Sequence, residues 1–320
     1  MKAIILAGGH ATRLWPLTRD RAKPLLPLGG RPLIDYLVAD LEDAVEEVLI
    51  STNEKFADDF EDYLAEYDRE ARVVVEEQAS EDEKPGTIGA VIDLLAREDI
   101  ADDVLILGGD NYFGLDMGGV LEFFEEVDGP VNAVYDVGDR EQARAFGVVD
   151  TDGDRITGFE EKPSDPPSTL VSTAVYLFPE DQLSLFDDYE TYFASTDIPA
   201  DEYLDEPGRL IEWAHTETAM YAYRFDGDWF DIGTPANYLA AQQEIGETRI
   251  DGTANDSNLG SNVWVMDGAE INGSELENCI VFPDAEITDA SLHDTIVDRE
   301  ATVDGKELED AVVGAYSRIS

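Results

Sequence analysis

Residues 2–18, KAIILAGGHATRLWPLT, set the pattern for most of the chain. The apolar run at residues 2–7 predicts a short buried strand. A loop rich in glycine and proline follows and leads to a helix at Pro32, since proline suits a first helical position. Apolar strands and helices then alternate. This alternation predicts an α/β fold with a Rossmann-like, mostly parallel sheet that helices cover on both faces.

The first domain is predicted to span residues 1–248, and its other strands and helices follow from the same pattern. Strands are expected at residues 48–51, 73–76, 104–107 and 131–137, and helices at 56–67, 88–97 and 117–127. After residue 140 the spacing changes to hairpin strands at 146–150 and 155–160, strands at 170–178 and 220–225, and a helix at 236–245.

The last part of the chain, residues 249–320, has no helical periodicity. Small and β-branched residues recur there in short strands five to seven positions apart. This spacing resembles the hexapeptide repeat of a left-handed β-helix, and the alternative is a plain β-rich tail. We therefore predict a short left-handed β-helix as a second domain, with a role in homo-oligomer formation or regulation.

Charge limits the partners of the protein. The 320 residues carry a formal net charge of −52, and the acids are spread along the whole chain. Such self-repulsion is screened only in concentrated salt, which predicts a salt-adapted, haloarchaeal protein. Nucleic acids and anionic membranes bind basic surfaces, so neither is expected as a partner. Residues 1–31 are the exception, with six basic side chains and one acid, and could bind a polyanion.

The first residues and the cysteine content predict the compartment. The apolar run from Ala3 to Ala7 is too short for a signal peptide or a membrane span. The single cysteine, Cys279, has an apolar neighbour in Ile280, which favours a packing role over a reactive one. Both features suit a reducing cytoplasm.

The loop after the first strand is predicted to hold a triphosphate. Its glycines allow backbone N–H groups to approach phosphate oxygens, and Arg13 and Lys23 add positive charge. An ordinary strand-to-helix turn is the alternative, but two glycines followed by Thr-Arg and a later lysine are far more specific. The residues assigned to the nucleotide here are Leu6, Ala7, Gly8, Gly9, Thr12 and Arg13.

An aspartate follows the predicted strand at residues 104–107. Asp110 comes after two glycines, at the carboxyl edge of the sheet where ligands of open α/β folds bind. A carboxylate in this place favours a Mg²⁺ ligand over a random surface acid. Asp231 lies in WFDIGTP, where Thr234 and Pro235 suit the cap and first position of a helix, so its role could also be structural.

These segments resemble the signature of the sugar-phosphate nucleotidyltransferases, most like the glucose-1-phosphate thymidylyltransferases and uridylyltransferases. The resemblance extends to about residue 245, although Ala11 and Ala174 stand where the family has glycine. It implies that Asp110 and Asp231 hold Mg²⁺ and that Arg13 and Lys23 act in catalysis. It also implies base binding by Gln78, Gly86 and Thr87, and sugar-phosphate binding by Asn111, Gly147, Glu161, Lys162 and Thr173.

The resulting prediction is an enzyme that joins a nucleoside triphosphate to a sugar 1-phosphate and releases pyrophosphate. dTTP or UTP is favoured over GTP, and glucose 1-phosphate is the first choice of sugar. Two alternatives stay open: a nucleotide sensor without turnover on the same fold, and a bifunctional enzyme whose β-helix also transfers an acyl group. Only His293 could serve as the base of such an acyltransferase.

Overall fold

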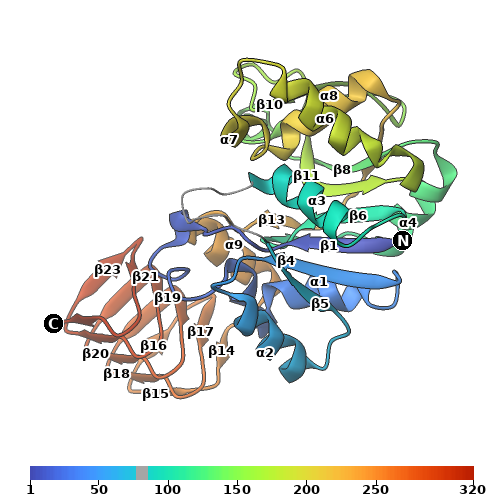
Figure 1. The fold of residues 1–320 in the computed structure, drawn as a ribbon. Coiled ribbons are helices and arrows are strands. Elements are labelled where there is room, and N and C mark those ends of the chain that lie inside the picture. Colours follow the sequence, from blue (N-terminus) through green and yellow to red (C-terminus); the bar gives the residue numbers. More distant parts are fainter. Residues whose placement is uncertain (77–85) are drawn as a thin grey trace. The chain divides into compact units, whose positions relative to one another are not determined.

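The computed structural model describes residues 1–76 and 86–320 (Figure 1). These residues form two compact units. Unit 1 comprises residues 1–8, 36–109 and 113–229, and unit 2 comprises residues 9–35, 110–112 and 230–320. Each unit draws on separate stretches of the chain, so this division does not test the predicted boundary at residue 248. That boundary stays a prediction.

Unit 1 is built on a nine-stranded sheet with the strand order β5-β4-β1-β6-β11-β8-β12-β10-β9. The strands β5, β4, β1 and β6 are parallel, with Leu49 and Ile106 on either side of Ile4. β11 then runs antiparallel to β6 and β8, and β9 and β10 form a hairpin. The bounds are β1 (Lys2–Leu6), β4 (Glu47–Thr52), β5 (Arg72–Val75), β6 (Val104–Gly108), β8 (Val131–Asp136), β9 (Gly147–Asp152), β10 (Arg155–Glu161), β11 (Leu170–Phe178) and β12 (Tyr221–Arg224). The predicted α/β fold with parallel strands is thus confirmed.

Helices supply the other half of the unit 1 core. Apolar residues of β1, β4 and β6 are packed against them and are almost inaccessible to solvent, as are Phe178, Phe186 and Tyr189. α1 (Leu33–Leu41) starts one residue after Pro32 and runs from unit 2 into unit 1. The helices that lie wholly in unit 1 are α2 (Ala57–Tyr67), α3 (Gly86–Arg97), α4 (Met117–Glu126), α5 (Arg140–Ala143), α6 (Ser184–Ala194), α7 (Ala200–Tyr203) and α8 (Pro207–Glu217), together with the short 3₁₀ turn η3 (Glu180–Gln182).

The C-terminal part of unit 2 is a stack of parallel strands, as predicted for a left-handed β-helix (Figure 1). Equivalent positions pair in register from coil to coil, as in the column Val265, Val281, Val297 and Val313. Apart from β14, whose two residues are exposed, the strands place apolar side chains in the core of the stack. The strands are β14 (Arg249–Ile250), β15 (Thr253–Asn255), β16 (Asn258–Leu259), β17 (Val263–Val265), β18 (Glu270–Asn272), β19 (Glu275–Val281), β20 (Glu286–Thr288), β21 (Ser291–Val297), β22 (Thr302–Asp304), β23 (Glu307–Glu309), β24 (Val312–Val313) and β25 (Arg318–Ile319).

The corners of these coils explain the acidic and amide residues of the tail. Asn262, Asn278, Asp294 and Asp310 form one column with positive φ, a backbone region that Asn and Asp tolerate better than other residues with a side chain. Asn262 donates to Asn278, and Asn278 donates to Asp294, sixteen positions further on in each case. Cys279 is fully buried within the stack, and burial raises the pKa of its thiol to about 11. Its predicted packing role is confirmed.

The remaining part of unit 2 holds the loop that follows β1. It contains the 3₁₀ turns η1 (Thr12–Leu14) and η2 (Lys23–Leu25), and a short hairpin of β2 (Pro27–Leu28) and β3 (Arg31–Pro32). α9 (Pro235–Ile245) begins as predicted, with Thr234 as its cap: the Thr234 hydroxyl accepts from Asn237 N. β7 (Asn111–Phe113) and β13 (Trp229–Asp231) pair in a two-stranded sheet. No helix in the described part of the chain is both long and apolar enough to span a membrane.

Candidate active site

The end of β1 delivers the predicted phosphate loop, and the next strand holds it in place. Ala7 N donates to Ser51 O at 2.7 Å, and Asn53 Nδ2 donates to Gly8 O at 2.9 Å. A Cβ added at Gly8 would lie 2.2 Å from Glu76 Oε1, so any other residue would require the Glu76 carboxylate to move. The backbone of Leu6, Ala7 and Gly8 is therefore fixed on the unit 1 side.

The loop continues in unit 2 with Gly9. The space beside its Cα is open. A Cβ there would meet no other described atom within 4 Å. Thr12 and Arg13 follow on η1, with exposed side chains. Ala11 lies in the left-handed region with φ 44° and ψ 46°, the conformation that a family glycine would adopt without strain. The Thr18 hydroxyl donates to Ala11 O at 2.8 Å and helps to hold this strained turn.

Lys23 lies between two carboxylates that the sequence analysis had assigned to one metal ion. Its Nζ is 2.7 Å from Asp110 Oδ2 and 3.7 Å from Asp231 Oδ1. Only 6% of the Lys23 side chain is exposed, so this is a buried ammonium with two acidic partners. Asp110, Asp231 and Lys23 come from three separate stretches of the chain, and all three belong to unit 2.

Two further residues complete this cluster. Asn111 Nδ2 donates to Asp110 Oδ1 at 2.7 Å, which leaves Oδ2 facing Lys23. A Cβ added at Gly233 would lie 3.4 Å both from Arg13 Nη2 and from an Asp231 oxygen, so guanidinium and carboxylate flank the same glycine. Burial raises the pKa of the Asp231 carboxyl, and the nearby charge of Lys23 opposes that rise. The cluster is thus an electrostatically coupled set.

The donor set suits a magnesium ion. Two carboxylates converge on one locus, where a cationic ammonium already lies close to both. Mg²⁺ is typically held by one or two carboxylates and keeps further positions for water and substrate phosphates. No group of three or more His, Cys, Asp or Glu side chains suited to a metal occurs among the described residues. A two-carboxylate site that is completed by substrate is therefore the arrangement these residues fit.

A second cluster, in unit 1, contains the predicted sugar-phosphate residues Glu161 and Lys162. Lys162 Nζ lies 3.0 Å from Glu161 Oε1 and 3.8 Å from Glu206 Oε1. Lys162 has φ 45°, and its N–H donates to Phe146 O at 3.1 Å. Such a left-handed residue is strained and is common at functional sites.

Two glycines, Gly147 and Gly208, leave room for the Glu161 carboxylate. A Cβ added at Gly147 would lie 2.9 Å from Glu161 Oε2, and one added at Gly208 would lie 1.8 Å from the same atom. Glu161 is therefore packed between β9 and the start of α8. Gly208 and Glu206 were missed in the sequence analysis, which predicted no helix at α8. A Pro-Gly pair after an acidic run, at residues 204–208, was the available signal.

The other predicted residues are more dispersed. Thr173 is buried, and its hydroxyl donates to Ala133 O at 3.0 Å. Gly86 has φ +73° and, with Thr87, begins α3, where a Cβ at Gly86 would lie 2.5 Å from Leu204 O. Gln78 lies outside the described residues. Asn111 lies beside Asp110 in unit 2, whereas Gly147, Glu161, Lys162 and Thr173 belong to unit 1.

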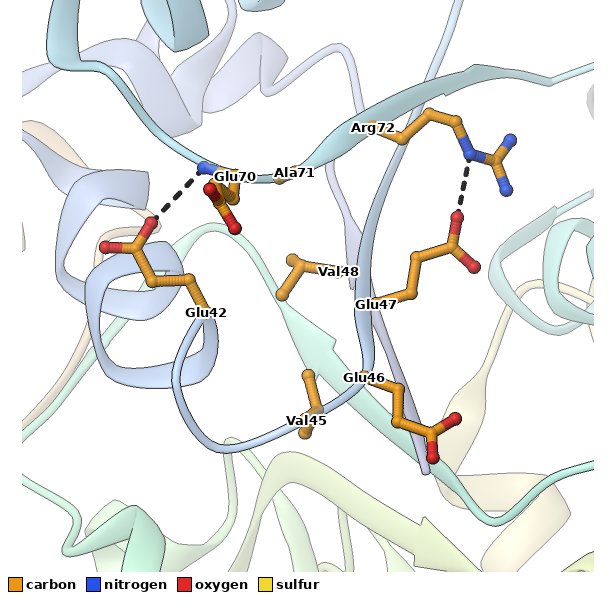
Figure 2. Close-up of a pocket in the computed structure, with 8 residues that line it drawn as sticks. All are labelled: Glu42, Val45, Glu46, Glu47, Val48, Glu70, Ala71 and Arg72. Atoms are coloured by element: carbon orange, nitrogen blue, oxygen red, sulfur yellow. Dashed lines mark hydrogen bonds and ion pairs between the residues drawn. The ribbon is translucent and has the colours of Figure 1, made fainter.

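A pocket of about 270 Å³ in unit 1 contains none of these residues (Figure 2). It is lined by Glu42, Val45, Glu46, Glu47, Val48, Glu70, Ala71 and Arg72. Arg72 and Lys2 neutralise Glu47, at 2.9 Å in each case, and Arg69 lies 2.7 Å from Glu42. These ion pairs are half-exposed, so Glu42 and Glu47 are ordinary surface acids with basic partners. We therefore assign the pocket no role in the chemistry.

Comparisons with known proteins agree on one family. Residues 2–248 match the family described as "Nucleotidyl transferase". A relative from Sulfolobus acidocaldarius named "Putative mannose-1-phosphate guanyltransferase" is 29% identical over 245 residues, 77% of this chain and 63% of its own. A UTP–glucose-1-phosphate uridylyltransferase, AglF, from Haloferax volcanii is 30% identical over 263 residues, 79% of this chain and all of its own.

A solved structure is also similar. It is a 2.76 Å crystal structure from Bacillus anthracis with sucrose bound, named "Putative Glucose-1-Phosphate Thymidylyltransferase". The TM-score is 0.64 and the identity 26%, and the match covers 79% of this chain and 98% of that one. The chain spans less than two thirds of the Sulfolobus relative and the full length of the Haloferax one.

Proposed function

Because the chain belongs to the nucleotidyl transferase family, we propose that it transfers the nucleotidyl group of a nucleoside triphosphate to a sugar 1-phosphate. The products are a nucleotide sugar and pyrophosphate. The observation that carries this proposal is the cluster in which the buried Lys23 ammonium lies 2.7 Å from Asp110 and 3.7 Å from Asp231, both of them partly exposed. A phosphate-binding cation beside two metal-binding acids is what phosphoryl chemistry requires.

In the proposed reaction, a phosphate oxygen of the sugar 1-phosphate attacks the α-phosphorus of the triphosphate. The bond from that phosphorus to the oxygen bridging to the β-phosphate breaks in line, and pyrophosphate leaves with the electron pair. The nucleophile is already an anion, so no general base is needed. The protein's contribution is alignment of the two substrates and stabilisation of charge.

Each residue of the first cluster has a part in this scheme. Arg13 and Lys23 bind the triphosphate oxygens and stabilise the charge of the leaving pyrophosphate. Asp110 and Asp231 hold Mg²⁺, which when bound neutralises phosphate charge. Asn111 orients Asp110 through the hydrogen bond at 2.7 Å. In unit 1, Lys162 binds the sugar phosphate and Glu161 accepts hydrogen bonds from sugar hydroxyls.

For the substrates, we favour dTTP or UTP with glucose 1-phosphate. The names of the three similar proteins refer to three different nucleotides, so the comparisons do not select the base of the triphosphate. Two of those names pair a pyrimidine nucleotide with glucose 1-phosphate, and the amide of Gln78 suits a pyrimidine edge.

The test is pyrophosphate release over a matrix of dTTP, UTP, GTP, ATP and CTP against glucose, mannose and N-acetylglucosamine 1-phosphates, in molar KCl with MgCl₂. We expect release with dTTP or UTP and glucose 1-phosphate, and release about a thousandfold slower with the Asp110→Asn variant. Binding of a triphosphate without release in any pairing would instead support the nucleotide sensor.

We also propose that the enzyme is salt-adapted, on the basis of its net charge of −52, and that it is a cytoplasmic homo-oligomer, on the basis of its single buried cysteine and its β-helix. Lowering KCl from about 1 M to about 0.1 M lengthens the Debye length from roughly 3 Å to 10 Å, so repulsion between surface acids grows. The melting temperature should therefore fall steeply over this range. A melting temperature that is independent of KCl would contradict salt adaptation, and sedimentation in molar KCl tests the oligomer.

A further inference from the structure

Arg21 joins the phosphate loop to the C-terminal strands within unit 2. Its Nη2 lies 3.4 Å from Asp298 Oδ1, and its guanidinium carbon lies 4.8 Å from the centre of the Phe282 ring. Phe282 and Asp298 directly follow β19 and β21, and both are buried. The cation thus has an ionic and an aromatic partner on neighbouring coils of the β-helix.

The Asp298 carboxylate is itself fixed. Its Oδ1 also accepts from Arg299 N at 2.8 Å, and its backbone N–H donates to Val313 O at 2.9 Å. On the other side of the pair, Arg21 Nη1 is buried without a hydrogen-bond partner among the described residues. Arg21 therefore depends strongly on the contacts that it does make, because a buried guanidinium without partners is unfavourable.

Only one residue separates Arg21 from Lys23, and the segment between them is rigid. Ala22, Lys23 and Leu26 are all buried. Leu25 N donates to Ala22 O and Leu26 N donates to Lys23 O, both at 3.0 Å. A shift at Arg21 would consequently be transmitted to Lys23, since a packed turn does not absorb it locally.

The same pair lies beside α9, the helix that follows Asp231. Tyr238 of α9 is buried, and its hydroxyl donates to Pro27 O in the phosphate loop. Burial raises the pKa of Tyr238, and the charges of Arg21 and Asp298 act on it in opposite directions. Arg21 and Asp298 are thus close to both segments that carry the buried cluster.

We propose that Arg21 and Asp298 are positioning residues, through which the C-terminal strands hold Lys23 in place between Asp110 and Asp231 and so set the affinity for the triphosphate. The inference rests on the proposed function. It assigns the β-helix a part in substrate binding, in addition to the predicted role in assembly. The alternative is an ion pair that contributes only to stability.

The experiment compares Arg21→Gln and Asp298→Asn with the wild-type full-length protein in molar KCl. Arg19→Gln is the matched control, because Arg19 is on the same loop and forms its exposed pair with Asp20. Pyrophosphate release with UTP and glucose 1-phosphate, or with the best pair of the matrix, gives KM for each substrate. A second measurement, independent of activity, is the acetylation rate of Lys23 relative to exposed Lys55, followed by mass spectrometry.

We expect both variants to raise KM for the triphosphate about tenfold, with less than a twofold change for the sugar 1-phosphate. Lys23, now protected by burial, should be acetylated several times faster, whereas Arg19→Gln should leave both readouts unchanged. Unchanged KM and unchanged Lys23 protection would overturn the proposal even if the melting temperature falls. A second variant is available if Asp298→Asn does not fold. Arg21→Lys keeps the charge but loses the planar fork of the guanidinium, and it tests the positioning role by the same two readouts. A wild-type protein without turnover would refute the proposed function alone, because the acetylation comparison still tests the positioning role.

Discussion

Lys23 and Lys162 are the two cations assigned to substrate phosphates, and their surroundings are opposite. The Lys23 side chain is 6% exposed and lies between acids from two distant stretches of the chain. The Lys162 side chain is 55% exposed and pairs with the adjacent Glu161 and with Glu206. Charges interact strongly in a buried site and weakly at a solvated one. The difference suggests that Lys23 acts as part of a coupled set and Lys162 as a local clamp.

Neighbouring groups strengthen this contrast. Around Lys23, Asn111 holds Asp110 by a hydrogen bond, and the charges of Lys23 and Arg13 both act on Asp231. Removing one charge from such a set leaves the others uncompensated, which costs more than the lost contact itself. Around Lys162, water can replace a lost partner. Substitutions in the two clusters should therefore differ both in size and in the kinetic constant that changes.

The largest expected effect is at the two aspartates. Asp110→Asn and Asp231→Asn should each lower kcat about a thousandfold, because each removes one charge from the proposed Mg²⁺ site. The double variant should be scarcely worse than the worse single one, as for residues that act as a unit. Pyrophosphate release at saturating substrates measures this, with exposed Asp228→Asn as the control. Losses that multiply would show that the two acids act independently and would return Asp231 to a structural role beside Thr234.

A smaller effect, on KM, should appear at Lys162. Lys162→Ala should raise KM for the sugar 1-phosphate about 10- to 100-fold, as expected for the loss of one hydrogen bond to a charged group. KM for the triphosphate should stay within about twofold. Lys23→Ala should instead lower kcat as well, and Lys306→Ala, on the β-helix, serves as the control. Equal increases in both KM values for Lys162→Ala would contradict its assignment to the sugar phosphate.

The sequence predicted those features that depend on local pattern. The apolar run of β1, the aspartate after β6 and the Thr-Pro start of α9 are each encoded within a few residues, and the structure confirms these elements. The replacement of a family glycine by Ala11 is also visible in the sequence, whereas its φ of 44° comes from the structure. The roles of the individual site residues stay predictions, although Lys23, Asp110 and Asp231 do lie together.

The features that were not predicted depend on distant contacts. Arg21 and Asp298 are 277 positions apart, and no periodicity links them. The placement of Gly208 against Glu161 requires the packing of α8 on β10, which only the folded chain reveals. The sixteen-residue coil was not predicted for another reason. Corner residues and buried valines both repeat at sixteen positions, but the apolar residues also recur every five to seven positions within a coil, and this shorter spacing dominates the sequence pattern.

The smallest expected effect concerns two alanines with positive φ, one in each unit. Ala11, in the phosphate loop, and Ala174, in β11, have φ of 44° and 59°, where the resembling family has glycine. A glycine relieves about 1 to 2 kcal/mol of left-handed strain but adds about 0.4 to 1 kcal/mol of unfolded-state entropy. Ala11→Gly and Ala174→Gly should therefore each leave the free energy of unfolding unchanged or raise it by up to about 1.6 kcal/mol, as measured by urea titration in molar KCl. Ala241→Gly in helix α9 is the control with the opposite sign, because a glycine inside a helix lowers stability by about 1 kcal/mol. If Ala11→Gly destabilises the protein as much as Ala241→Gly, the phosphate loop stores no strain at Ala11; if only Ala174→Gly is stabilising, the strain is confined to β11.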